Sequence, residues 1–329
     1  MDELWRSGIA AVVASTGLAL VAALAARWWR RDDAAWWHRV YCVIMAASLA
    51  APVGGWLLPG VRIAWHTTTT PVASPAPGVW SGALAGLYAI GLAAMAVRLA
   101  MALAAVRRLR RDSHKLDEQW RQRVSEVAGH QAGCCRWHPH VRAPLSAGWL
   151  TPLVVLPRTA LQWPVDRLRA VLHHELAHVR RHDYAFHIIA AVQVAVFWPS
   201  PAAWWLARQA RLAAEVACDR AAAAVIGEAE YARVLVQSAR EFVADGHGPG
   251  LVAPSAGTDL FARVEVLLTP RAPLTPLRGA GPVMLLAGIG LIMLMAGVVH
   301  VAPIPGPRPD VEPGIHAVRH DALHHARHR

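Results

Sequence analysis

The segment HHELAH, at residues 173–178, contains two histidines four positions apart, His174 and His178, with Glu175 beside the first. Residues four apart in an α-helix lie on one face, so both imidazoles can bind one zinc ion at about 2 Å. Glu175 lies about 100° further around the helix, where its carboxylate can hold a water molecule beside the metal and accept its proton. The pattern indicates zinc-dependent hydrolysis, although a chain with 18 histidines can contain it by chance.

Residues 164–183 around this motif are predicted to form one helix. Pro164 suits the first turn of a helix, and Asp166 lies near the N-terminus, where an acid is favoured. Five apolar residues at helical spacing form a stripe: Leu168, Val171, Leu172, Leu176 and Val179. Because His174 and His178 fall on a different face, the stripe can pack against a core while the histidines bind the metal.

A catalytic zinc site needs three protein ligands and one open position, so a third ligand is expected downstream. Residues 211–225 (RLAAEVACDRAAAAV) are alanine-rich and predicted to be helical, and they place Glu215 and Asp219 on one face. We predict Glu215 as the third ligand and Asp219 as the partner of a ligand histidine. A solvated helix face, balanced by Arg211 and Arg220, is the alternative for this pair.

Four further residues are candidates for supporting roles. Asp183 can hold the metal helix in place from just beyond the motif. His182, Tyr184 and Arg211 are candidates to stabilise the oxyanion, by their proximity in sequence only. A surface or supporting role is the alternative for each of these three.

The composition indicates that part of the chain lies in a membrane. Of 329 residues, 55% are hydrophobic and 17% are charged, against about 25% charged in a typical soluble domain. Four stretches approach the roughly 20 apolar residues that a membrane helix needs: residues 8–26, 40–58, 79–106 and 280–303. We predict a mainly α, four-span integral membrane protein; buried helices of a soluble protein are the alternative.

Arginine placement predicts the orientation of these spans, because cytoplasmic loops carry an excess of positive charge. Arginines are concentrated at residues 27–39 and 107–111, whereas the loop at 59–78 contains a single one. Residues 107–279 are therefore predicted to be a cytoplasmic domain, α+β but mostly helical, in a bacterial inner-membrane protein. The N-terminus, the 59–78 loop and a disordered His-rich tail at 304–329 are predicted to lie outside.

Charge and cysteine content bear on the partners. The net charge of +11 falls largely on the predicted cytoplasmic side, and the sequence contains no zinc-finger spacing or RNA-binding signature. Membrane lipid is therefore a predicted partner and nucleic acid is not. The four cysteines show no CxxC pattern, which suits a reducing compartment.

The apolar segment at residues 185–210 bears on whether the metal site can form. If it crossed the membrane once, Glu215 and His174 would lie on opposite sides. The sequence WPSP at 198–201 divides it into two pieces, each too short to span a bilayer. We predict a helical hairpin that returns to the same side, packed on the inner leaflet or buried within the domain.

The run HELAHVRRHD followed by EVACD at 215–219 resembles the membrane-embedded M56 peptidases, the family of the penicillin-sensing signal transducers. Residues 144–157 (PLSAGWLTPLVVLP) and 260–270 (LFARVEVLLTP) are similar to the segments that precede the metal helix and the last span. The resemblance implies a gluzincin-like zinc endopeptidase that cleaves a cytoplasmic or juxtamembrane protein. Its implied zinc ligands are His174, His178 and Glu215, with Glu175 as the general base.

The resemblance also implies a regulatory role. In that family the peptidase removes a winged-helix repressor of the penicillinase-repressor type, often after self-cleavage, so such a repressor is the implied partner; a homodimer is possible. The penicillin sensors continue into a large extracellular domain. Only about 26 residues follow the fourth predicted span here, too few to fold such a domain, so covalent sensing by this chain is not expected.

Two other classes of function stay open. A general membrane metalloprotease, of the quality-control or CAAX-processing kind, shares the HExxH pattern and the distal ExxxD pattern. A non-enzymatic receptor or metal-responsive protein with a vestigial site is the other, since histidines in the C-terminal tail can bind metal outside the cell.

Overall fold

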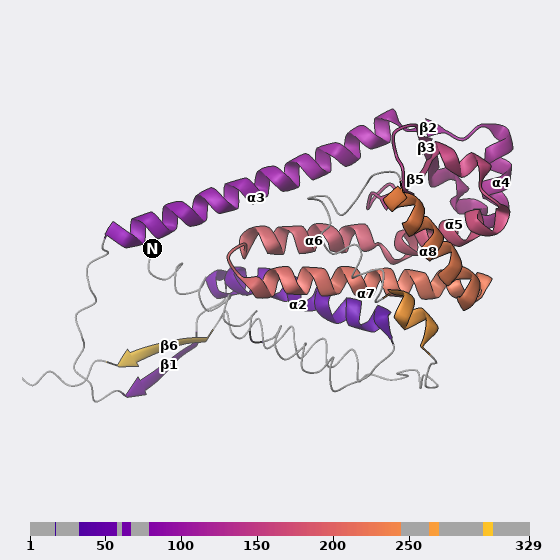
Figure 1. Cartoon of the computed structure of the whole chain (residues 1–329). Helices are drawn as coiled ribbons and strands as arrows, with labels where there is room; N and C mark the ends of the chain where they lie inside the picture. Colours follow the sequence, from indigo (N-terminus) through magenta and orange to yellow (C-terminus); the bar gives the residue numbers. More distant parts are fainter. Residues whose placement is uncertain are drawn as a thin grey trace, which may run out of the picture.

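The computed structural model describes residues 33–57, 61–66, 79–244, 263–269 and 299–304, together with Gly17. The described part is mostly helical and contains a small mixed sheet, as predicted for a mainly α chain. It is elongated, with long helices side by side and a compact end that contains the four-stranded sheet (Figure 1). The first predicted span and most of the fourth lie outside the described residues.

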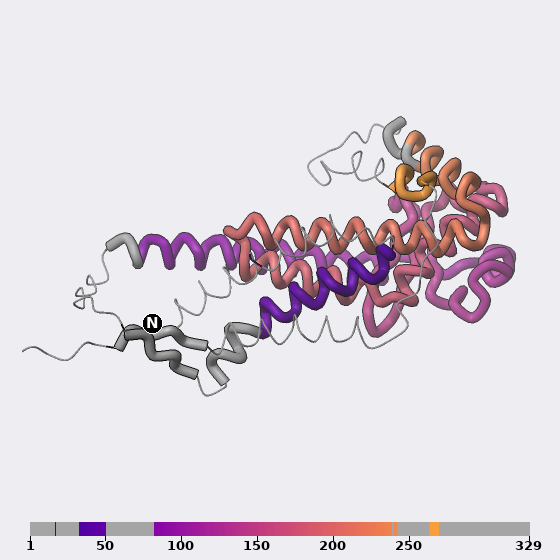
Figure 2. The backbone as a smooth tube through the Cα atoms, turned by 90° about the horizontal axis from the view of Figure 1, so that it is seen from below, coloured from indigo at the N-terminus to yellow at the C-terminus, as the bar shows by residue number. Residues whose placement is uncertain are grey.

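Four long helices form the elongated part: α2 (Ala34–Leu57), α3 (Val79–Asp112), α6 (Asp183–Val196) and α7 (Pro201–Ile226). Helix α2 packs along α6 and α7, as Figures 1 and 2 both show. Both α2 and α3 extend beyond the predicted spans, α2 at its start and α3 at its end. Neither extension contains glycine or proline, the two residues that end helices most strongly.

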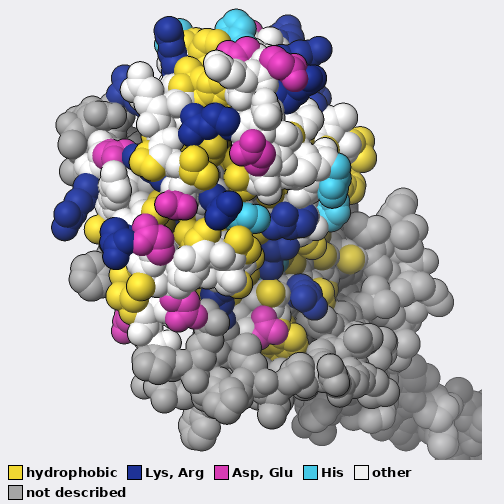
Figure 3. All heavy atoms as spheres, turned by 90° about the vertical axis from the view of Figure 1, so that its right-hand side faces the viewer, with side chains coloured by type: hydrophobic (Ala, Val, Ile, Leu, Met, Phe, Trp, Pro, Cys, Tyr) yellow, Lys and Arg dark blue, Asp and Glu magenta, His cyan; other side chains and the backbone are white. Residues whose placement is uncertain are grey.

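Helix α3 exposes large apolar side chains along its length, namely Leu84, Leu87, Ile90, Val97 and Met101. Within the described part of the chain, its segment Gly82–Asp112 is the one long and apolar enough to cross a membrane. At the compact end, by contrast, arginine and acidic side chains are interspersed with apolar ones (Figure 3). The molecule thus combines an apolar helix with a charged end.

Helices α6 and α7 form the predicted hairpin. Helix α6 ends at Val196 and α7 begins at Pro201, so the break predicted at the WPSP sequence is confirmed. Proline at the first position of α7 has no N–H to leave unpaired, and its ring prevents α6 from continuing. Because the chain reverses here, α7 returns alongside α6 to the compact end (Figure 1).

The compact end is built on a four-stranded sheet of order β2 (His114–Lys115), β3 (Cys135–His138), β5 (Leu153–Pro157) and β4 (Leu145–Ala147). Strands β3 and β5 are parallel and the other pairs antiparallel. Around it lie α4 (Glu118–Ala128), η1 (Gly129–Cys134), η2 (Arg158–Gln162), α5 (Val165–Arg181) and α8 (Glu228–Ala244). Every residue of β5 is buried, and the apolar stripe of α5 packs in the same core. Strand β4 lies at the edge of the sheet.

Strands β1 (Val61–His66) and β6 (Val299–Ile304) pair in parallel. The last residues of the predicted fourth span, 299–303, are therefore extended rather than helical. Valines at 299 and 301 are β-branched and favour strands, and Pro303 is unfavourable inside a helix. The pair joins the predicted outer loop to the C-terminal end of the predicted fourth span.

The Leu172→Ala variant should be less stable than the wild type. Leu172 is completely buried in the core that α5 shares with the sheet, and such truncations cost about 2–5 kcal/mol. The thermal unfolding midpoint of the detergent-purified chain should fall accordingly. Val165→Ala, an exposed position on the same helix, is the matched control, and equal midpoints for the two variants would contradict the packing.

Candidate metal centre

A sharp turn between α5 and α6 places Asp183 against His178. Helix α5 ends at Arg181 rather than at residue 183 as predicted, because His182 takes the left-handed conformation, with φ 56° and ψ 33°. The N–H of His182 bonds to the carbonyls at the end of α5, and Asp183 begins α6. The chain thereby turns back, and Asp183 Oδ2 lies 2.8 Å from His178 Nδ1.

The structure brings His174, His178 and Glu215 together from α5 and α7. The two Nε2 atoms are 3.2 Å apart, and each lies 3.6 Å from an oxygen of Glu215. Ligand atoms about 2.0–2.2 Å from a tetrahedral zinc ion would be separated by about 3.3–3.6 Å. The two nitrogens and the carboxylate therefore fit a zinc ion.

Asp219 contacts the other ring nitrogen of His174, at 3.0 Å from Nδ1. It is completely buried. The Tyr231 hydroxyl donates to Asp219 at 2.6 Å and lies 2.9 Å from His174 Nδ1. Arg263 donates to both oxygens of Asp219, at 2.7 Å each. Asp219 thus contacts one of the two motif histidines, and Arg263 is the cation that pairs with it; its role as the partner of a metal ligand stays a prediction.

Asp183 supports His178 as Asp219 supports His174. Its two oxygens lie 3.2 Å from Arg181 Nε. His38 Nε2, on α2, lies 3.5 Å from Asp183 Oδ1, and Cys218 Sγ lies 3.6 Å from Oδ2. Since the partners of a ligand histidine fix its ring orientation, this buried cluster extends the site into α2.

The charges around the ligands shift the pKa values strongly. Burial alone would lower the pKa of His174, but the carboxylates of Asp219 and Glu215 outweigh it and raise that pKa to about 10. Burial would raise the pKa of Glu215, yet His174, Arg263 and His178 lower it to about 2. For Asp183 too, burial would raise the pKa, while His178 and Arg181 lower it to about 2. Both carboxyl groups are thus ionised at neutral pH, whereas His174 must give up a proton before it can bind a metal.

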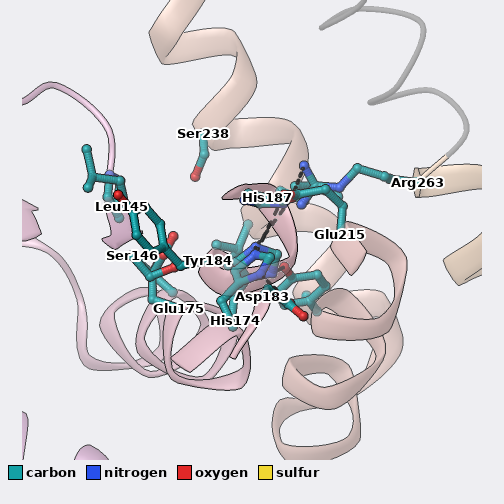
Figure 4. Close-up of a pocket in the computed structure, with 16 residues that line it drawn as sticks. Leu145, Ser146, His174, Glu175, Asp183, Tyr184, His187, Glu215, Ser238 and Arg263 are labelled. Atoms are coloured by element: carbon teal, nitrogen blue, oxygen red, sulfur yellow. Dashed lines mark hydrogen bonds and ion pairs between the residues drawn. The ribbon is translucent and has the colours of Figure 1, made fainter. Parts of the chain in front are cut away.

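The three residues line a cavity of about 360 Å³. Glu175 and Tyr184 lie on the side formed by Leu145 and Ser146 of β4, opposite Arg263 (Figure 4). Glu175 is buried in this wall. The cavity thus brings the predicted general base to the same space as the three potential ligands.

Of the three oxyanion candidates, Tyr184 lines the cavity, whereas Arg211 and His182 do not. Arg211 is exposed on α7, and His182 forms the left-handed turn. His187 lines the cavity and was missed by the sequence analysis. Its Nε2 is buried and has no hydrogen-bond partner among the described residues.

The residues missed from the sequence are His38, His187, Tyr231 and Arg263. Arg263 stands in the segment LFARVEVLLTP that carried part of the family resemblance, the one available signal for it. The other three stand in helices without a motif around them. Their proximity to the site depends on tertiary packing.

Comparison with known proteins identifies the family that this sequence matches. The family model described as BlaR1 peptidase M56 matches residues 9–267. A curated relative, the regulatory protein BlaR1 of Bacillus licheniformis, is 29% identical over 94 residues, which are 29% of this chain and 16% of the relative. The similarity to that relative thus covers a small part of its length, and the family match is much broader.

The Asp183→Asn variant should bind zinc less tightly, because it keeps the shape of the side chain but removes the charge that orients His178. Loss of such a partner typically costs about 10–100-fold in metal affinity. Competition with a chromophoric chelator measures the change. Glu241→Gln, which removes an exposed carboxylate paired with Arg167, should leave the affinity unchanged, and a similar loss in both variants would refute the role of Asp183.

Proposed function

This chain belongs to the BlaR1 peptidase M56 family, and we propose that it is a membrane-bound zinc endopeptidase that cleaves a regulatory protein on the cytoplasmic side. The observation that carries the proposal is the convergence of His174, His178 and Glu215 in a cavity that also contains Glu175. Two histidines and one glutamate are the protein ligands in one class of catalytic zinc sites, in which the fourth position stays open for water or substrate.

In this proposal, His174, His178 and Glu215 hold the zinc ion. The ion would act as a Lewis acid towards the scissile carbonyl and lower the pKa of a coordinated water towards about 7. Glu175 accepts the proton of the attacking water and passes it to the leaving amine. Tyr184, which lines the same cavity, is positioned to donate a hydrogen bond to the substrate.

Strand β4 supports a peptide as the substrate. Among the described residues it is an edge strand, paired with β5 on one side only, and its residues Leu145 and Ser146 line the cavity. An edge strand presents unpaired backbone N–H and C=O groups, to which an extended peptide can add as a further strand. A peptide bound in this way would run past Glu175.

The shape of the molecule supports a membrane location for the peptidase. Helix α3 is apolar and exposed, and it ends in arginines beside the compact end. Strands β1 and β6 must lie on one side of a membrane to pair, as expected if residues 59–78 and the C-terminal tail are both outside. The cavity then belongs to the cytoplasmic side, together with the arginine-rich end of α3.

The family points to the substrate that we propose. The curated relative is named as a regulatory protein, and we propose a winged-helix repressor of the penicillinase-repressor type as the substrate. Self-cleavage, at an arginine-rich connector of this chain, is part of the same proposal. A broad-specificity membrane protease and a non-enzymatic receptor are the outcomes that would replace it.

The Glu175→Gln variant should keep its zinc but lose peptidase activity. The amide cannot accept the proton of the attacking water, and a positioned general base contributes about 10²–10⁴-fold to rate. Metal content is measured by atomic emission, and activity by cleavage of a quenched fluorescent peptide library. Full activity in this variant, at wild-type zinc content, would exclude Glu175 as the base.

Quantitative proteomics of cells that express wild type or Glu175→Gln tests the substrate. We expect one cytoplasmic winged-helix repressor to accumulate in the variant, and fragments of this chain to appear only with the wild type. Accumulation of many membrane proteins would indicate general quality control. Unchanged proteomes with an unchanged cellular response would indicate a non-enzymatic receptor.

A further inference from the structure

Arg263 connects two carboxylates of the metal centre. Its Nε and Nη2 atoms each donate to one oxygen of Asp219 at 2.7 Å, a bidentate arrangement that fixes the plane of the carboxylate. Its Nη1 lies 3.2 Å from Glu215 Oε2. One guanidinium group thus contacts the proposed ligand Glu215 and the partner of the proposed ligand His174.

The contacts of Asp219 leave it little freedom. Tyr231, His174 and Arg263 all bond to a carboxylate that is completely buried. A buried carboxylate without a compensating cation is costly, and of these partners Arg263 alone carries a permanent charge. Removal of that charge would allow Asp219 to rotate, and the ring of His174 would lose its fixed orientation.

The segment that carries Arg263 is docked by a second contact. Leu267, one helical turn later, is 1% exposed and packs with Ala170 of α5, Ala222 of α7 and Tyr231 of α8. The apolar contact and the ion pair therefore attach residues 263–269 to all three helices around the site. Those residues follow the helices in the sequence and come from outside the hairpin that supplies Glu215.

We propose that Arg263 is a positioning residue of the metal centre, which aligns Glu215 and, through Asp219, His174. The inference rests on the proposed function and deepens it. Arg263 acts on the ligands without binding the metal, and the docking of residues 263–269 becomes a condition for tight zinc binding. Lysine cannot replace it fully, because an ammonium lacks the planar pair of donors.

The test uses the full chain, purified in detergent and loaded with Zn²⁺ or Co²⁺. We expect Arg263→Gln to weaken Zn²⁺ binding by about 10–100-fold and to alter the visible absorption of the Co²⁺ form. Arg263→Lys should give an intermediate affinity. If Arg263 acts through Asp219, the loss in the double variant with Asp219→Asn should be smaller than the sum of the two single losses.

Arg167→Gln is the matched control. Arg167 also pairs through two nitrogens with one carboxylate, Glu241, at 2.9 and 2.5 Å, but it lies outside the cavity lining. The Arg167→Gln variant should leave the Zn²⁺ affinity and the absorption spectrum of the Co²⁺ form unchanged. If Arg263→Gln fails to fold, the Arg263→Lys variant alone tests the positioning role, because it keeps a positive charge beside Asp219.

The outcomes separate this inference from the proposed function. Wild-type affinity and an unchanged Co²⁺ spectrum in both Arg263 variants would overturn the positioning role and leave the proposed function intact. A wild-type chain that binds no Zn²⁺ would overturn the proposed function itself. Equal losses in the Arg263 and Arg167 variants would assign the effect to general stability, against a specific role.

Discussion

Charge compensation in a buried space is the constraint on which the candidate metal centre depends. Asp183 and Asp219 are almost or completely buried, and a buried carboxylate is tolerated when it is paired and hydrogen-bonded. Each is paired with an arginine, Asp183 with Arg181 and Asp219 with Arg263. Each also contacts the Nδ1 atom of one histidine, which turns the two Nε2 atoms towards each other. The facing nitrogens, 3.2 Å apart, therefore result from interactions behind the histidines.

The hairpin of α6 and α7 makes this arrangement possible. The left-handed turn at His182 starts α6 with Asp183 already beside His178. The break before Pro201 then returns the chain, so that Glu215 and Asp219 reach the histidines from α7. A continuous apolar helix over the same residues would carry Glu215 away from α5. Two local departures from helical geometry thus assemble the site.

Much of the centre could be predicted from the sequence, because its four central residues follow helical spacing. His174 with His178, and Glu215 with Asp219, are each four apart, and this spacing places each pair on one face whatever the tertiary structure. Arg263 and His38 follow no such rule. Each is a single basic residue in a segment far along the chain, and only tertiary packing brings it to the site.

The fold, too, could be predicted in part from the sequence and depends in part on tertiary packing. Composition and hydrophobic runs indicate helices, but they do not fix the boundaries. Helix α2 begins in a polar stretch because its tryptophans, Trp36 and Trp37, are buried against α6 and α7. The turn at His182 was also missed, since histidine carries no signal for a left-handed residue as glycine does. Contacts between helices, which a single sequence does not record, decided both.

The pairing of β1 with β6 brings together two segments that are far apart in the sequence. From β1 the chain leads back through α2 to His38, which contacts Asp183; β6 lies further along the chain than Arg263, which holds Asp219. The two-stranded ribbon lies at the opposite end of the molecule from the four-stranded sheet (Figure 1). The parallel pairing therefore holds residues 61–66 and 299–304 beside each other, although they lie on opposite sides of the candidate site residues in the sequence.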